Sequence, residues 1–428
     1  MNDSARCPVF DFAKFAQLGN EVIPILNSVR DYAPISWSEQ NNGWVVCGHA
    51  RVVDGLRGNL PLSGGRHKGI EANIPKARQS ELIPNILKYF SMFAVNMDPP
   101  RHARVRKLLV KAFSKKVVEN FRPTARENIK ANLDSLSERT EIEFVGECAR
   151  AITARNLLEI IGLTDTATYL PKLERWSHLM VAGTGAIIGG YADEALTRET
   201  DAVFAEQAAI FQAEIDARRN APGDDLVSQL VAAREDGDSL TDDEIIANLI
   251  LIIIAGHDTT LNTMALSILE LSRNAAARRY ILDNPDKVLN ASMELMRFVS
   301  MSTHQFRFVQ DDFDWNGNAL KKGQMVHLMI GAANRDPSTF TDPETLDLTR
   351  AQDQNLTFGP GLHHCIGHLF AKMQLTEFFP EFLRRFESFE VIGDVPFSGG
   401  VSFRGPISMQ LRLMKNGQDV IGGSSSTW

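Results

Sequence analysis

Residues 358–367 read FGPGLHHCIG, a short stretch with three glycines, a proline and Cys365. The glycines and the proline predict a tight turn. The apolar, helix-like run 366–379 follows, so Cys365 is predicted to lie at the N-terminus of a helix. Because a helix N-terminus stabilises a thiolate, we expect the pKa of Cys365 to be depressed.

Two other interpretations of Cys365 stay open at this point. A free cysteine is most often a buried and inert core residue. A metal cluster built from His363, His364, Cys365 and His368 is the other interpretation. Zinc sites usually draw their ligands from two separated pairs, and no second pair is visible in the sequence.

The segment resembles the heme-binding loop of cytochrome P450, Phe-x-x-Gly-x-[His/Arg]-x-Cys-x-Gly. Phe358, Gly361, His363, Cys365 and Gly367 occupy its fixed positions. The resemblance implies that Cys365 is the proximal iron ligand of heme b (iron protoporphyrin IX). It also implies that His363 bonds a heme propionate and that Phe358 packs beside the sulfur. Electron donation by such a thiolate favours O–O cleavage.

A second motif is Glu294 and Arg297, spaced as Glu-x-x-Arg. On a helix the two charges lie on one face and can pair, although a solvated surface pair is the ordinary case. The spacing resembles the Glu-x-x-Arg pair of the same family. The resemblance implies that both residues, with Arg350, form a buried structural network on the cysteine side.

A third motif, AGHDTT at 255–260, interrupts a long apolar helix. Buried polar side chains need partners, and a threonine can bond a carbonyl one turn back. A polar kink without chemistry is the alternative. The motif resembles the oxygen-binding groove of the family, which implies that Asp258 and Thr259 form an acid–alcohol pair that relays protons. Because both residues are present, the resemblance favours a monooxygenase.

A fourth motif, DPPRHARVR at 98–106, predicts a helix capped by Asp98 with proline in its first turn. His102 and Arg106 are then four residues apart on one face. A solvated basic face is the alternative. The resemblance assigns both residues to one propionate and Arg307 to the other. Two buried carboxylates require such cationic partners.

Helical spacing dominates the middle of the chain, and short strand-like runs lie towards both ends. We therefore predict a mainly α fold with small β-sheets (α+β), in one domain at 1–415. The resemblance implies the cytochrome P450 fold, wrapped around a buried heme. The Gly/Ser-rich tail at 416–428 is predicted to be disordered. Helices are expected at 115–137, 141–161, 194–219, 242–273 and 285–299, and strands at 35–36, 44–47, 306–309, 325–329, 389–392 and 407–414.

The 428 residues are 44 % hydrophobic and carry a net charge of −8, which fits a globular protein and argues against nucleic-acid binding. Four widely spaced cysteines are too few for a disulfide scaffold, so a reducing cytoplasm is expected. The N-terminus has no apolar signal core, and the apolar run 245–255 is too short to span a bilayer. We expect a cytoplasmic monomer with no membrane contact.

The positions that line the substrate pocket in the family hold both apolar and polar side chains in this sequence. This mixture predicts a medium-sized pocket for a small apolar organic substrate. The pocket candidates are Phe93, Met180, Ile252, Ala255, Met301, Thr303 and His304.

The resemblance implies dioxygen as co-substrate and electrons from a separate ferredoxin and ferredoxin reductase. Between positions 101 and 118 there are seven lysines or arginines and no acidic residue. A solvated helix face is the plain interpretation. The alternative is that Lys107, Lys111 and Lys372 form a docking surface for an acidic ferredoxin, because complementary charge steers association. A rival function is a non-catalytic heme-thiolate protein that recruits a partner.

Overall fold

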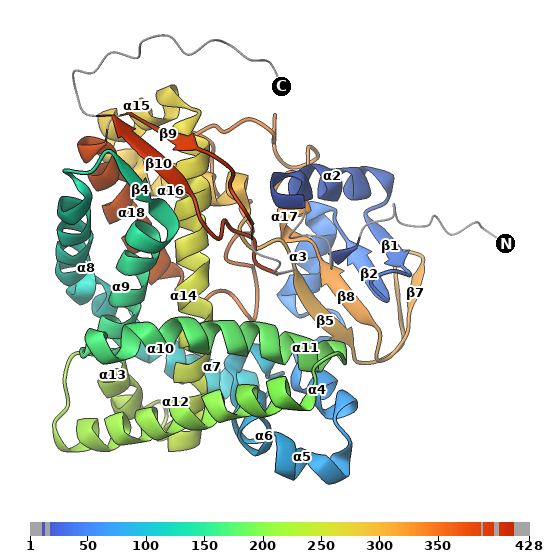
Figure 1. Ribbon diagram of the computed structural model, residues 1–428. Coiled ribbons are helices and arrows are strands. Elements are labelled where there is room, and N and C mark those ends of the chain that lie inside the picture. The colour runs from blue at the N-terminus through green and yellow to red at the C-terminus, as the bar shows by residue number, and fades with distance from the viewer. Residues whose placement is uncertain (1–10, 13–17, 387, 398–401, 415–428) are drawn as a thin grey trace.

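The computed structural model describes residues 11–12, 18–386, 388–397 and 402–414. The long helix α14 (Asp242–Ser272) crosses the molecule, most other helices lie around it, and the larger sheet lies to one side (Figure 1). The predicted mainly helical fold with small sheets is confirmed. The predicted tail at 416–428 lies outside the described residues.

The remaining helices run through the whole described chain. They are α2 (Val22–Tyr32), α3 (His49–Arg57), α4 (His67–Asn73), α5 (Lys76–Leu82), α6 (Pro84–Tyr89), α7 (Arg101–Ala112), α8 (Lys115–Leu136), α9 (Ala151–Ile161), α10 (Thr166–His178), α11 (Thr184–Gly189), α12 (Glu194–Asn220), α13 (Leu226–Ala232), α15 (Ala275–Asp283), α16 (Val288–Val299), α17 (Ile330–Ala333) and α18 (His368–Arg385). Short 3₁₀ turns occur at η2 (Gly19–Glu21), η3 (Phe90–Met92), η4 (Ala94–Asn96) and η7 (Pro285–Lys287), and π-helical turns at η5 (Phe144–Arg150) and η6 (Leu179–Gly183).

The larger sheet has the strand order β1 (Ile35–Ser38), β2 (Gly43–Val46), β8 (Met325–Leu328), β5 (Gln305–Val309) and β3 (Leu62–Ser63). Only β2 and β8 pair in parallel in it. A second sheet has the order β4 (Glu141–Glu143), β10 (Gln410–Met414) and β9 (Ser388–Ile392), and β6 (Phe313–Trp315) forms a hairpin with β7 (Asn318–Leu320). The larger sheet thus joins residues near the front of the chain to residues just before the cysteine loop.

The prediction of one helix at 141–161 is wrong at its start. Residues 141–143 form strand β4, in which Ile142 pairs with Leu411 of β10, and α9 begins only at Ala151. The alternation Glu-Ile-Glu buries Ile142 against the sheet and leaves Glu141 exposed. A distant strand partner therefore overrides the local helical pattern.

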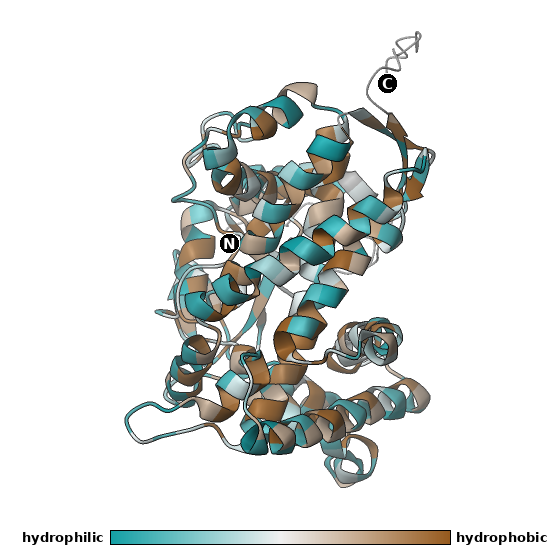
Figure 2. Cartoon of the chain, turned by 90° about the vertical axis from the view of Figure 1, so that its left-hand side faces the viewer, coloured by the Kyte–Doolittle hydropathy of each residue, from teal (hydrophilic) through white to brown (hydrophobic). Residues whose placement is uncertain are grey.

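Helix α14 is apolar nearly all round because it lies in the core. Its start is fixed by a capping box between Thr241 and Glu244. By length and composition it is the one helix in the described part of the chain that could cross a membrane, but 61 % of its most apolar window is buried inside the protein. The other helices in view in Figure 2 carry hydrophilic and hydrophobic residues side by side, in contrast to α14. This is expected of surface helices with one apolar face.

The Glu294 carboxylate of α16 is buried between two arginines. Arg297 donates to both of its oxygens at 2.8 Å, and Arg350 donates to Oε1 at 3.1 Å. The side chains of Glu294 and Arg297 are both 0 % exposed. Arg297 also donates to the carbonyl of Asn334 at 2.7 Å. The structure thus brings together the three residues predicted to form a network, and the network ties α16 to the segment before the cysteine loop.

We expect Arg297→Met to destabilise the protein strongly, because it removes one partner of a buried carboxylate. Breaking a buried ion pair typically costs about 3–5 kcal/mol. Urea unfolding followed by tryptophan fluorescence measures the change. Lys130→Ala, which removes an exposed pair with Asp134 on α8, is the matched control and should leave the midpoint unchanged. Equal midpoints for the Arg297 variant and the wild type would contradict a stabilising role.

Candidate functional site

The loop before α18 turns tightly around two glycines with positive φ, Gly359 (66°) and Gly361 (83°). A Cβ at Gly361 would lie 2.5 Å from the Cα of Arg57, so only glycine lets the loop lie against α3. The backbone N–H of Cys365 donates to the carbonyl of Phe358 at 2.8 Å. Gly367 precedes the first residue of α18, so Cys365 lies just before a helix N-terminus, as predicted.

The expectation that the protein alone depresses the pKa of Cys365 is wrong. Burial raises the pKa of the thiol, and this outweighs the opposing influence of the Gly367 N–H and of the charges on Arg106 and Lys372. A bound metal cation deprotonates a ligating thiol outright. The helix start and the two cations would therefore assist a thiolate formed when a metal ion binds.

The groups around Cys365 are held by short contacts. Arg106 donates to the carbonyl of His364, and the Nδ1 atom of His368 lies 2.9 Å from the carbonyl oxygen of Cys365. The ammonium of Lys372 lies 5.2 Å from the centre of the Phe358 ring. The loop is thus fixed from α7 on one side and from α18 on the other.

The residues predicted to bind propionates converge. The rings of His102 and His363 lie 4.5 Å apart, and a cavity of ≈ 260 Å³ is lined by His363, Arg307 and Asp98, among others. Burial and nearby arginines lower the pKa of His363 to about 3, so its ring is neutral. Neither ring nitrogen of His102 has a hydrogen-bond partner among the residues described. Donors without acceptors fit a cofactor that carries carboxylates.

Asp98 does not cap α7 with its side chain as predicted. The helix begins at Arg101, and the Asp98 carboxylate instead accepts from the Ser63 hydroxyl at 2.5 Å, the Gly64 N–H and the Gln310 amide. Strand β3 and the residues after it offer donors that a local pattern could not reveal. Asp98 therefore fixes the segment after β3 next to the start of α7.

Arg66, in that segment, is a site residue that no sequence motif contains. It donates to Oε1 of Gln305 at 2.8 Å, and its guanidinium lies 4.6 Å from the centre of the Phe306 ring. Arg66 also contributes to lowering the pKa of His363, so it lies near the propionate-binding residues. Only the pairing of β3 with β5 brings it there, which explains why sequence spacing missed it.

In the middle of α14, Asp258 and Thr259 point in different directions. The Thr259 hydroxyl donates to the carbonyl of Ala255 at 2.6 Å, the one-turn bond predicted for a buried threonine. The Asp258 carboxylate accepts from the Ser177 hydroxyl of α10 at 2.7 Å. His257 lies 3.7 Å from its other oxygen. Ser177 was missed because its segment resembles no motif.

The predicted substrate residues fall into three groups. Ile252 is partly exposed and Ala255 is exposed, although α14 is otherwise mostly buried. Phe93 and Met180 are each 1 % exposed and belong to the same core cluster as Ile252, with Phe93 against Phe204. Thr303 is buried, and its N–H bonds the carbonyl at position 402. Ile252 and Ala255 are thus the pocket candidates that present accessible surface.

Met301 and His304, the other two pocket candidates, are buried. Met301 packs with Leu266 and Val299 in a separate small cluster. His304 is buried and stacks on Phe12 at 5.0 Å.

Two of the three lysines of the predicted docking surface form ion pairs. Lys107 pairs with Glu235 at 2.7 Å and with Asp236 at 2.8 Å, and Lys111 pairs with Glu235 at 3.0 Å. The acidic turn before α14 therefore neutralises both lysines, which a stretch without acidic residues could not show. Lys372 remains beside the cysteine loop.

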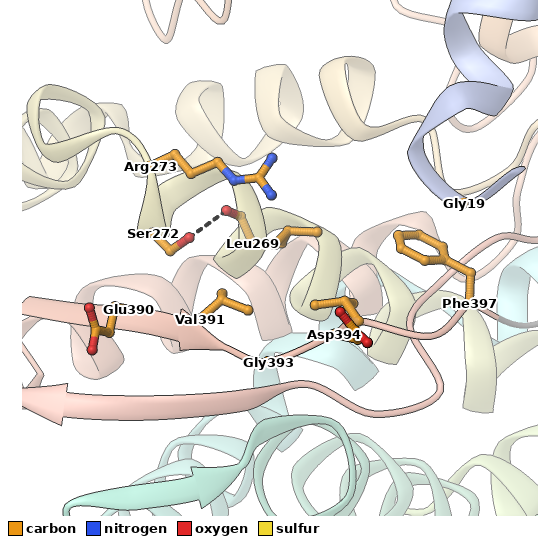
Figure 3. Close-up of a pocket in the computed structure, with 10 residues that line it drawn as sticks. Gly19, Leu269, Ser272, Arg273, Glu390, Val391, Gly393, Asp394 and Phe397 are labelled. Atoms are coloured by element: carbon orange, nitrogen blue, oxygen red, sulfur yellow. Dashed lines mark hydrogen bonds between the residues drawn. The ribbon is translucent and has the colours of Figure 1, made fainter. Parts of the chain in front are cut away.

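A larger pocket of ≈ 530 Å³ lies elsewhere, at the C-terminal end of α14 (Figure 3). Its lining includes Leu269, Arg273 and Phe397, with Glu390 of strand β9. None of its lining residues is a predicted site residue, so its size carries no catalytic meaning.

Comparison with known proteins agrees with this geometry. The profile of the Cytochrome P450 family matches residues 192–396. The mycinamicin IV hydroxylase/epoxidase of Micromonospora griseorubida is 32 % identical over 324 residues, 74 % of this chain and 78 % of that protein. Cytochrome P450 107B1 of Saccharopolyspora erythraea is 31 % identical over 293 residues, 68 % of this chain and 69 % of that protein.

Solved structures show the same fold. Epothilone B-bound cytochrome P450epoK superposes with a TM-score of 0.83 at 25 % identity, covering 95 % of this chain and 99 % of that one. The chain belongs to the cytochrome P450 family. It is therefore a monooxygenase, and the family membership implies a heme-thiolate cofactor.

We expect Cys365→Ala to abolish the strongly red-shifted Soret band that the reduced protein gives with carbon monoxide, because the iron would lose its thiolate. The matched control is Cys148→Ala, a cysteine buried in the core near α9, which should keep the band. A Cys365 variant that retained the red-shifted band would overturn the ligand assignment.

Proposed function

We propose that this protein uses heme b, dioxygen and two electrons from a separate ferredoxin and reductase to hydroxylate or epoxidise a small to medium apolar organic substrate. One observation carries the proposal. The cysteine loop, two histidines and two arginines converge on one site, where His102 has no acceptor in the described structure. A heme with two propionates supplies the matching groups.

The chain would hold the cofactor from the cysteine loop, helix α7 and strand β5. Cys365 would ligate the iron, His102 and Arg106 of α7 would bond one propionate, and His363 and Arg307 would complete the propionate site. Phe358 and Gly367 would shape the loop around the sulfur. The bound heme supplies the activation of dioxygen. We further propose that the network of Glu294 serves to hold this scaffold.

Asp258 and Thr259 of α14 would move protons on the side of the pocket opposite the cysteine loop. The Asp258 side chain is 37 % exposed, so it can exchange protons with water. The Thr259 hydroxyl is held by the Ala255 carbonyl, whose residue is exposed in the middle of the core helix. Since the two side chains diverge, an intervening water would connect the carboxyl group to the hydroxyl.

The substrate proposal rests on the apolar surface of Ile252 and Ala255 and on the relatives. One relative is a mycinamicin IV hydroxylase/epoxidase, and one solved relative binds epothilone B. These names support an organic substrate. A screen of such compounds for the low-to-high-spin shift of the heme would identify candidates. We also propose that residues 1–415 form one heme domain and that the protein acts as a cytoplasmic monomer.

We expect Thr259→Ala to bind heme and substrate normally but to release peroxide in place of product, because the proton-relaying hydroxyl is gone. Asp258→Asn should slow turnover, since proton delivery contributes roughly 10²–10⁴-fold. The ratio of product to NAD(P)H consumed measures the coupling, and the rate of product formation measures the turnover. Thr376→Ala, whose hydroxyl bonds only carbonyls of α18, is the matched control. Unchanged coupling and rate in both site variants would remove the acid–alcohol role.

For the redox partner, we expect Lys372→Gln to slow ferredoxin-supported turnover, most at low salt, because exposed charge is screened beyond about 8–10 Å at physiological ionic strength. Lys107→Gln should have a smaller effect, since Glu235 and Asp236 already neutralise this lysine. Peroxide-driven turnover bypasses the partner and should not change. Equal losses in both assays would indicate damaged heme binding and exclude a docking role for Lys372.

A further inference from the structure

Three arginines surround the proposed propionate site, and they differ in the charges nearby. Burial lowers the pKa of Arg106 and that of Arg307, and the charges of Cys365 and Asp98 respectively oppose this lowering. For Arg66 the neighbouring charge is Arg307, a like charge, which together with burial lowers its pKa to about 9. Arg66 is thus the arginine of this site whose surroundings favour the gain of an anion.

The guanidinium of Arg66 is already oriented. Nη2 donates to Oε1 of Gln305 at 2.8 Å, and the Phe306 ring lies against its face. Its Nε atom is buried and finds no partner within the described residues. A guanidinium that is fixed in plane and has unused donors matches the fork geometry of a carboxylate.

Arg66 lies close to the residues of the proposed propionate site. Gly64, two residues earlier, is so close to His363 that a Cβ there would lie 3.3 Å from Nε2. Gln305 lies two residues before Arg307 on strand β5, so the two share one face of that strand. Arg66 therefore borders the proposed propionate site.

We propose that Arg66, oriented by Gln305 and Phe306, binds a carboxylate in addition to those assigned to His102, Arg106, Arg307 and His363. The carboxylate comes either from a heme propionate, as a further ligand, or from an acidic substrate. This inference rests on the heme site proposed above. Its test uses the heme-loaded protein and two readouts that do not depend on turnover.

The first readout is the rate at which heme leaves the protein for excess apomyoglobin, followed by absorbance. If a propionate is the ligand, Arg66→Gln should speed heme loss by about tenfold or more, the effect of one charge-assisted hydrogen bond. Arg66→Lys, which keeps the charge but not the fork, should fall between. Arg78→Gln, an exposed arginine paired with Glu194, is the matched control and should lose heme at the wild-type rate.

The second readout is the spin-state titration with hexadecanoic acid and with its methyl ester. If the ligand is a substrate carboxylate, Arg66→Gln should weaken binding of the acid by about tenfold and leave binding of the ester unchanged. Should neither compound shift the spin state of the wild type, heme loss alone decides.

Gln305→Glu gives a second variant in case Arg66→Gln folds poorly. It places a carboxylate where Arg66 already donates a hydrogen bond, so this carboxylate would compensate the charge of Arg66. As in Arg66→Gln, heme should then leave faster or the acid should bind more weakly. Wild-type heme loss and wild-type acid binding in these variants would overturn the proposal. A wild type without the red-shifted carbon monoxide band would instead overturn the proposed heme site, which separates the two failures.

Discussion

The structure depends on positive charge that the chain gathers but does not fully neutralise. Arg66, Arg106 and Arg307 come from three distant segments and meet beside two neutral histidines. Removing cations from water costs several kcal/mol each unless anions compensate them. A cofactor with carboxylates can return that free energy on binding. Binding of the proposed heme would therefore couple the larger sheet, helix α7 and the cysteine loop.

The Glu294 network is the opposite case, because its charges are compensated within the protein. The carboxylate is shared by Arg297 and Arg350, and the remaining donors of Arg297 reach backbone carbonyls. The charges of this network are compensated without a ligand, and the network holds the segment that leads into the cysteine loop. The Glu294 network thus supports the cysteine loop on one side. On the other side, the uncompensated charge of the arginines favours the binding of an anion.

Residues whose partners lie within one turn or one motif could be predicted from the sequence. The pairing of Glu294 with Arg297, the loop around Cys365 and the bond from Thr259 to Ala255 are of this kind. Arg66, Ser177 and strand β4 could not be predicted, because each depends on a segment far away in the chain. The pKa of Cys365 was misjudged since burial, which opposes the helix start, is a property of the fold.

The acidic turn that neutralises Lys107 also connects helix α7 to the segment before α14. Helix α7 carries His102 and Arg106 on one face and Arg104 and Lys107 on the other. Arg104 pairs with Asp238 of the turn and with Glu244, the capping residue of α14. These ion pairs connect the helix proposed to hold the propionates to the start of the helix that carries Asp258. The two helices are thereby braced against each other by charge.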